Sequence, residues 1–239
     1  MSRLATNLLL AVVVVVTVAV LLSLGFWQLQ RAEDKRAVLQ ARDTQRAMPA
    51  LQISSVQQSL PEFRAVTVSG QFDAERFWLL ENRIHQGRYG FEVVSPFELT
   101  GGETLLVHRG WIPGDRSRRE IPTVETPAGL LEITGYIDAG SATGFELSGA
   151  SVDAGWPKRV QWLPVARAEA ALDRPLPDVL LRLQAGEPGM FVNTYQAVNM
   201  PPEKHVGYAV QWFGMATIIG FLYLLHLWRQ RSTGGKGLE

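Results

Sequence analysis

An uncharged, strongly apolar run near the start of the chain constrains the fold more than any other feature of the sequence. It reads LLLAVVVVVTVAVLLSLGF and extends from Leu8 to Phe26. At about 1.5 Å per residue, a helix of this length covers roughly the 30 Å hydrocarbon layer of a bilayer. In lipid every backbone group has to be satisfied within the segment, so we predict a transmembrane helix over residues 8–26. The alternative is a cleaved signal peptide, because Ser23-Leu24-Gly25 offers small residues at a suitable spacing.

A second apolar run, Val206 to Leu227, carries no formal charge when His226 is neutral. The sequence WRQR follows it, which puts a tryptophan and two arginines where a lipid–water interface would lie. We predict a second transmembrane helix over residues 206–227. Two spans put residues 1–7 and 228–239 on one side of the membrane and the central part of the chain on the other.

Basic residues favour one orientation of these two spans. Arg229, Arg231 and Lys236 follow the second run and favour a cytoplasmic tail. Basic residues also follow the first run, but long domains are translocated largely regardless of their charge. We therefore expect cytoplasmic termini and a central domain outside the cytoplasm.

The central part changes from helical to strand-like patterning. Residues 27–48 are rich in Ala, Leu, Gln, Arg and Glu and precede Pro49, which predicts a helical extension of the first span. From Phe63 onward, short runs with period-two alternation are bounded by Gly, Pro, Asp and Asn, as in an antiparallel sheet or small barrel. Val165 begins a short helical pattern, and final strands could begin at Asp178 and Gly189.

These patterns predict an α+β membrane protein. Two terminal transmembrane helices flank one mainly antiparallel-β extracytoplasmic domain, residues 49–205, which contains a short helix. The chain has 23 basic and 23 acidic residues and no cysteine. Charge balance argues against nucleic-acid binding, and the lack of cysteine excludes disulfides, thiolate metal sites and covalent haem attachment. The common hydrolase, nucleotide-binding and metalloprotease motifs are absent, so we expect a scaffold or binding module and not an enzyme.

Two stretches of the central domain are dense in polar and glycine residues. ENRIHQGRYG is typical of a turn between strands, with Gly87 and Gly90 supplying positive φ and Arg83 bonded to carbonyl oxygens; the alternative is a polar loop for a partner or an anionic group. Arg109, Gly110 and Trp111 could form an exposed recognition corner; the alternative is that Trp111 is buried and capped by a turn at Pro113-Gly114. His85 and His108 are isolated, which favours structural roles.

The segment before the second span presents a more specific pattern. On a helix, His205, Tyr208 and Trp212 share one face with two alanines, while Gly207 and Gly214 fall on the opposite side, where a second helix could approach closely. An imidazole above an aromatic face suits a flat ligand such as haem. Lys204 and Arg31 lie near the boundary, where they could pair with haem propionates. The alternative is that these side chains only anchor the helix at the interface.

Four stretches of the chain occur in a fixed order around and within one body with two terminal spans: GFWQLQRAEDK, ENRIHQGRYGFEVVSPF, VHRGWIPGD and NMPPEKHVGYAVQWF. In these stretches and in this plan the chain resembles the Surfeit locus protein 1 family. It implies a bacterial cytochrome c oxidase assembly factor that binds haem a through His205 and assists its insertion into oxidase subunit I. Family motifs also fall on residues with a structural or partner-binding role: Trp27, Arg83, Gly110 and Trp111.

The same resemblance implies partners and a location. The partners would be subunit I of the oxidase, other oxidase assembly or haem a synthesis factors, and membrane lipid. The location would be the cytoplasmic membrane of a bacterium, with the main domain in the periplasm. One alternative is a cofactor-free membrane scaffold that holds oxidase subunits during assembly. A two-span sensor is a further alternative, which the short C-terminal tail disfavours.

Overall fold

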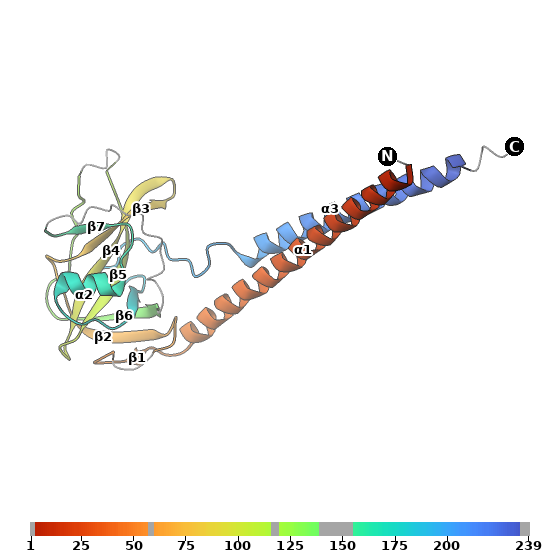
Figure 1. Cartoon of the computed structure of the whole chain (residues 1–239). Coiled ribbons are helices and arrows are strands. Elements are labelled where there is room, and N and C mark those ends of the chain that lie inside the picture. The colour runs from red at the N-terminus through yellow and green to blue at the C-terminus, as the bar shows by residue number, and fades with distance from the viewer. Residues whose placement is uncertain (1–2, 57–59, 116–119, 139–154, 235–239) are drawn as a thin grey trace. The chain divides into compact units, whose positions relative to one another are not determined.

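A computed structural model describes residues 3–56, 60–115, 120–138 and 155–234 (Figure 1). It contains two compact units. Residues 1–40 and 197–239 form the helical unit, and residues 41–196 form the body. The fold class expected from the sequence is confirmed: a long apolar helix near each end of the chain, and between them a mainly β body with a short helix.

Each long helix begins and ends where local chemistry dictates. Helix α1 (Arg3–Ala47) continues without interruption through the apolar run and the polar extension, and it ends just before Pro49. Helix α3 (Pro202–Gly234) starts with proline, which has no N–H to leave unpaired at the first helical position. Both helices are long and apolar enough to be candidate membrane spans. Because α3 begins at Pro202, His205 lies in its first turn.

Small residues allow α1 and α3 to pack closely in antiparallel directions. Asn7 lies 3.5 Å from Gln230, while Gln28 contacts His205 at the other end of the pair. A Cβ atom added to Gly25 would lie 2.5 Å from the ring of Phe213, so the ring occupies space that only glycine leaves open. On α3, the small buried residues are Ala209 and Ala216.

The expectation that Gly207 and Gly214 face the second helix is wrong. A Cβ atom at either position would meet nothing within 4 Å. The helices approach each other closely at Gly25 of α1. On α3, the buried alanines Ala209 and Ala216 are small enough to allow this approach. The predicted face containing His205 is thus the one turned toward α1, and the glycines lie on the outer side.

One sheet forms most of the body. Its described strands are β1 (Leu51–Gln52), β2 (Ala65–Phe72), β3 (Trp78–His85), β4 (Arg88–Leu99), β5 (Thr104–Pro113), β6 (Leu131–Asp138), β7 (Lys158–Val160) and β8 (Leu180–Leu183). The strand order is β1-β2-β6-β8-β5-β4-β3-β7, and β2 also pairs with β4. This additional pairing closes β2, β6, β8, β5 and β4 into a barrel.

Strand β4 closes the barrel by changing its partner along its length. Residues 88–94 pair with β3, whereas residues 97–99 pair with β2. Pro96 lies between these two ladders, at a point where a missing backbone N–H is tolerated. The partner change leaves β3 and β7 as an extension of the sheet beside the barrel.

Apolar side chains fill the barrel and cover the sheet extension. Phe97, Val107 and Ile133 belong to a fully buried cluster of barrel-strand residues. The short helix α2 (Val165–Leu172) buries Ala168 and Leu172 against a second cluster on β3, β4 and β5, so the predicted short helix is confirmed (Figure 1). The segment from Gly189 is not the expected strand; it makes one isolated antiparallel bridge, between Val192 and Trp111.

The buried ring of Phe97 provides a test of the barrel core. Phe97 is fully buried and packs edge-to-face on Phe72 with ring centroids 4.8 Å apart. We expect Phe97→Ala to lower the free energy of unfolding by about 3–5 kcal/mol, because it leaves a cavity. Ile84 is 74% exposed, so Ile84→Ala is the control and should change stability by less than about 0.5 kcal/mol. Urea unfolding of the full-length proteins in detergent, followed by tryptophan fluorescence, measures both. If the Phe97→Ala and Ile84→Ala proteins have equal free energies of unfolding, the assigned core is wrong.

Candidate functional site

The imidazole of His205 contacts helix α1 through one nitrogen only. Its Nδ1 lies 2.8 Å from Oε1 of Gln28. An amide oxygen can only accept, so Nδ1 carries the proton in this arrangement and the neutral ring has a bare Nε2. Nε2 is buried and has no hydrogen-bond partner among the residues that the structure describes. The helix packing thus leaves one unsatisfied nitrogen lone pair at the start of α3.

The other residues of the predicted ligand face surround His205 unequally. Trp212 is half-buried on the side of α3 that faces α1, whereas Tyr208 is 44% exposed and lies at the margin of that face. Lys204 is exposed. Arg31 is also exposed; it lies 3.5 Å from Asp34 and places its guanidinium 5.8 Å from the ring of Trp27.

An apolar groove lies further along the helix pair. It has a volume of about 430 Å³ and lies between α1 and α3. Its lining residues are Val14, Val15, Val18, Ala19, Leu22, Gly220, Tyr223 and Leu224. Neither Tyr208 nor Trp212 lines this groove, so it is distinct from the slot expected beneath His205.

In the body, the Arg-Gly-Trp sequence forms a β-bulge. Val93 pairs with Gly110 and Val94 pairs with His108, so Arg109 is the extra residue of β5. Gly110 has φ +95°, and a Cβ atom there would lie 2.6 Å from the carbonyl oxygen of Val192. Glycine is therefore required for this backbone shape and for the bridge to Val192.

Arg109 is a buried structural residue and does not form part of an exposed corner. Its guanidinium donates to Gly189 O at 2.9 Å, Glu125 O at 2.5 Å, Thr126 Oγ1 at 2.9 Å and Ser95 Oγ at 3.3 Å. The rings of Phe72 and Phe191 lie 4.9 and 4.8 Å from it. Burial lowers the pKa of Arg109 to about 10. The side chain remains charged at neutral pH and fastens two loops to β5.

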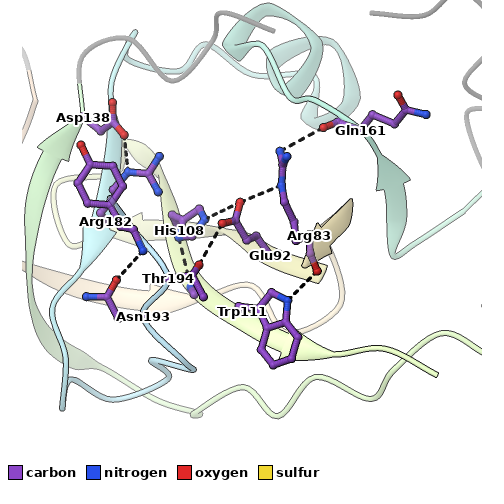
Figure 2. A network of polar contacts seen from close by, with 11 residues as sticks. Arg83, Glu92, His108, Trp111, Asp138, Gln161, Arg182, Asn193 and Thr194 are labelled. Atoms are coloured by element: carbon purple, nitrogen blue, oxygen red, sulfur yellow. Dashed lines mark hydrogen bonds and ion pairs between the residues drawn. The ribbon is translucent and has the colours of Figure 1, made fainter. Parts of the chain in front are cut away.

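Trp111 and Arg83 also have structural roles, in agreement with the expectation of a turn and a buried tryptophan. Trp111 is buried and donates from Nε1 to the carbonyl oxygen of Arg83 at 3.0 Å. Arg83 in turn donates to Gln161 O at 3.3 Å (Figure 2). Gln86 and Gly87, both at positive φ, form the tight turn between β3 and β4.

Glu92 is the centre of a polar network that the sequence analysis did not identify. One carboxylate oxygen lies 3.1 Å from Arg83 Nε and 3.4 Å from His108 Nε2, and the other accepts a bond of 3.2 Å from Thr194 (Figure 2). His108 Nδ1 accepts from Gly110 N at 3.3 Å, which assigns the proton of the neutral ring to Nε2, facing Glu92.

Electrostatics keep Glu92 ionised and His108 neutral. Burial alone would raise the pKa of Glu92, but its interactions with His108, first of all the hydrogen bond, and the charges of Arg83 and Arg182 lower it to about 2. Burial lowers the pKa of His108 below its usual 6.5, with Glu92 opposing this shift. Glu92 stays ionised beside a neutral His108, because its carboxylate faces the imidazole N–H and is stabilised by the positive charges of Arg83 and Arg182.

A second ion pair in the same network helps to attach the last residues of the body to the sheet. Arg182 of β8 forms an ion pair with Asp138 of β6, and its guanidinium lies 4.2 Å from the ring of Tyr195. Together with Thr194 and the Val192 bridge, this contact fastens residues 192–195 to the sheet. Arg83, Glu92 and His108 lie in two of the stretches that carry the family resemblance, but only the arrangement of the strands reveals that their side chains meet.

Comparisons with known proteins agree on one family. A sequence model of the SURF1 family matches residues 15–217. A SURF1-like protein of Rickettsia felis is 28% identical over 225 residues, covering 90% of this chain and 95% of the relative. A SURF1-like protein of Rickettsia bellii is 27% identical, covering 95% and 92%. An uncharacterized SURF1-like protein of Mycobacterium tuberculosis is 26% identical, covering 69% and 60%.

The pKa of Glu92 predicts how the stability of the body depends on pH. The folded-state value of about 2 lies below the ordinary 4.5, so Glu92 contributes stability above pH 4.5 that is lost as the pH falls toward 2. His108 is coupled to Glu92 and contributes a loss of stability as the pH falls below 6.5, because the unfolded state then binds a proton that burial disfavours in the folded state.

We expect Glu92→Gln to flatten the stability profile between pH 4.5 and 2, as measured by denaturant unfolding at a series of pH values. Glu132 is exposed on β6, so Glu132→Gln is the matched control and should keep the wild-type profile. If Glu92→Gln keeps the full acid loss in this window, the carboxylate is not held as described.

Proposed function

The chain belongs to the SURF1 family, which implies a role in cytochrome c oxidase assembly, and on that premise we propose that it carries haem a at the membrane interface and assists its insertion into oxidase subunit I. In this proposal haem a is cargo. The protein acts as a carrier and not as an enzyme, and His205 is the residue that holds the iron.

The observation that supports this proposal best is the bare Nε2 of His205. A buried polar atom without a partner costs about 1–3 kcal/mol, so such an atom needs an explanation in a native structure. Coordination of an iron ion would satisfy the lone pair, and a neutral imidazole is a common axial ligand of haem. Because Nε2 is covered, haem entry requires a shift of the atoms that cover it.

Other side chains near His205 fit the remaining parts of haem a. Lys204 and Arg31 are exposed near the boundary of the candidate spans and could pair with anionic propionates. Arg31 would share its charge with Asp34. Trp212 and Tyr208 would offer aromatic surface to the porphyrin, with Tyr208 able to turn because it is largely exposed. A single protein ligand suits a carrier that later releases its cargo.

The body supplies rigid support and a docking surface in this proposal. Contacts within the body engage the side chains of Arg109, Trp111 and Glu92, so these residues would act by fixing the shape of the body. Contacts with subunit I and with other oxidase assembly or haem a synthesis factors would then come from the outer surface of the body. The two candidate spans would cross the cytoplasmic membrane with the termini in the cytoplasm and the body in the periplasm.

Replacement of His205 tests the cargo site. We expect His205→Ala protein, purified in detergent from cells that make haem a, to lose most of its haem absorbance, because the iron loses its ligand. His226 is the matched control, since it is exposed on the same helix about 31 Å away along the axis. His226→Ala should keep the wild-type haem content and spectrum.

Two results would contradict the carrier proposal. If His205→Ala retains the haem content and spectrum of the wild type, the ligand assignment is wrong. If the wild-type protein contains no haem although the cells make haem a, the alternative of a cofactor-free scaffold for oxidase subunits is favoured.

Single cysteines can test the proposed topology, because the natural chain has none. We expect Glu132→Cys, on an exposed part of the body, to react with a membrane-impermeant maleimide in intact cells. Arg231→Cys, near the end of α3, should react only after the cytoplasmic membrane is broken. The reverse labelling pattern would overturn the orientation.

A further inference from the structure

We infer that Gln28 is the positioning residue for His205: its amide oxygen holds the imidazole in the tautomer that has the proton on Nδ1 and directs the Nε2 lone pair to the ligand site. The assignment of iron as that ligand rests on the proposed function. The assignment of the tautomer does not: it follows from the orientation of the Gln28 amide, whose Oε1 and not its NH2 group faces Nδ1.

The position of Gln28 follows from the packing of the two helices. Leu21, Gly25, Gln28 and Ala32 repeat at the spacing of one helical face of α1. Leu21 and Ala32 are buried, and Gly25 lies under the ring of Phe213. Gln28 is the one polar member of this set, and it meets the first turn of α3. The close approach of the helices therefore brings together two side chains that are 177 residues apart in the sequence.

The contact selects between the two neutral forms of the imidazole. Neutral histidine has one N–H, and the other nitrogen keeps a lone pair. Oε1 of Gln28 at 2.8 Å from Nδ1 accepts that hydrogen, so the lone pair is left on Nε2, the buried atom without a partner. With the amide in this orientation, the opposite tautomer would place two lone pairs against each other across this distance and would bury an unbonded N–H at Nε2.

The chemistry of the amide fits a carrier. Histidine ligands commonly donate their second N–H to a carboxylate or a carbonyl oxygen, which fixes the ring and raises its basicity as a ligand. A carboxylate would do this strongly, and a neutral amide does it weakly. Gln28 would orient His205 while leaving the iron–imidazole bond weak enough for transfer.

A neighbouring glutamine provides a matched control. Gln30 lies on the same helix, is exposed, and donates to Asp34 at 3.2 Å, so it has no contact with His205. The variants are Gln28→Met, which removes the acceptor at similar size, and Gln28→Glu, whose ionised carboxylate can only accept. Gln30→Met changes the same side chain in the same way two residues further on.

The first measurement uses haem-free, full-length protein labelled with ¹⁵N-histidine. Long-range ¹⁵N–¹H correlation spectra report the tautomer of each ring, and His205→Ala identifies the signal of His205. We expect the Nδ1–H form in the wild type, in Gln30→Met and in Gln28→Glu, and a mixture of tautomers in Gln28→Met. An Nε2–H form in the wild type would overturn the inference, whether or not the protein binds haem.

The second measurement is the affinity for haem a. Loss of a residue that orients a metal ligand typically lowers affinity 10–100-fold, and we expect this for Gln28→Met but not for Gln30→Met. Gln28→Glu should bind at least as tightly as the wild type. Equal affinities for the two methionine variants would overturn the positioning role. Haem retention by His205→Ala would instead contradict the proposed function, so the two failures are distinguishable.

Discussion

Small residues on facing sides hold α1 and α3 together, and this contact creates the candidate site. Both helices are candidate membrane spans, and between spans lipid would offer no hydrophobic driving force, so close packing and polar contacts would have to join them. Gly25 admits the ring of Phe213, and Ala209 and Ala216 keep the facing surface of α3 flat. Where the apolar stripe ends, the same approach sets Gln28 against His205. The chemistry attributed to His205 is therefore a consequence of how the helices meet.

The body is organised differently, by buried charges that are satisfied within it. Arg109 donates to four oxygen atoms between two aromatic rings, and Glu92 contacts residues of three separate segments. These contacts fasten the residues that precede α3 to the closed barrel. A charge network of this kind is costly to break, so it fixes one arrangement of the barrel and its loops. Such rigidity suits a domain that presents a constant surface to a partner.

Local sequence patterns predicted the long helices, the short helix at Val165, most strands and the helical face that carries His205. The patterns could not predict contacts between distant segments. A helical wheel shows that Gly207 and Gly214 share a side, but it does not show which side meets another helix. Likewise, the alternation in β2 and β4 does not reveal that these strands pair and close the barrel. A buried Trp111 was one of the two alternatives that the sequence offered, whereas the burial of Arg109 was not expected, because the bulge that buries it depends on pairing with β4 and Val192. Gln28 and Glu92 were missed for the same reason.

The most direct test of the central claim is the resonance Raman spectrum of the ferrous haem a complex, recorded with unlabelled and with ¹⁵N-histidine protein. Coordination by His205 predicts a low-frequency iron–histidine stretching band that shifts to lower frequency with the heavier nitrogen. A complex whose spectrum has no band sensitive to the histidine label would contradict the claim, because the iron would then be held by something other than an imidazole.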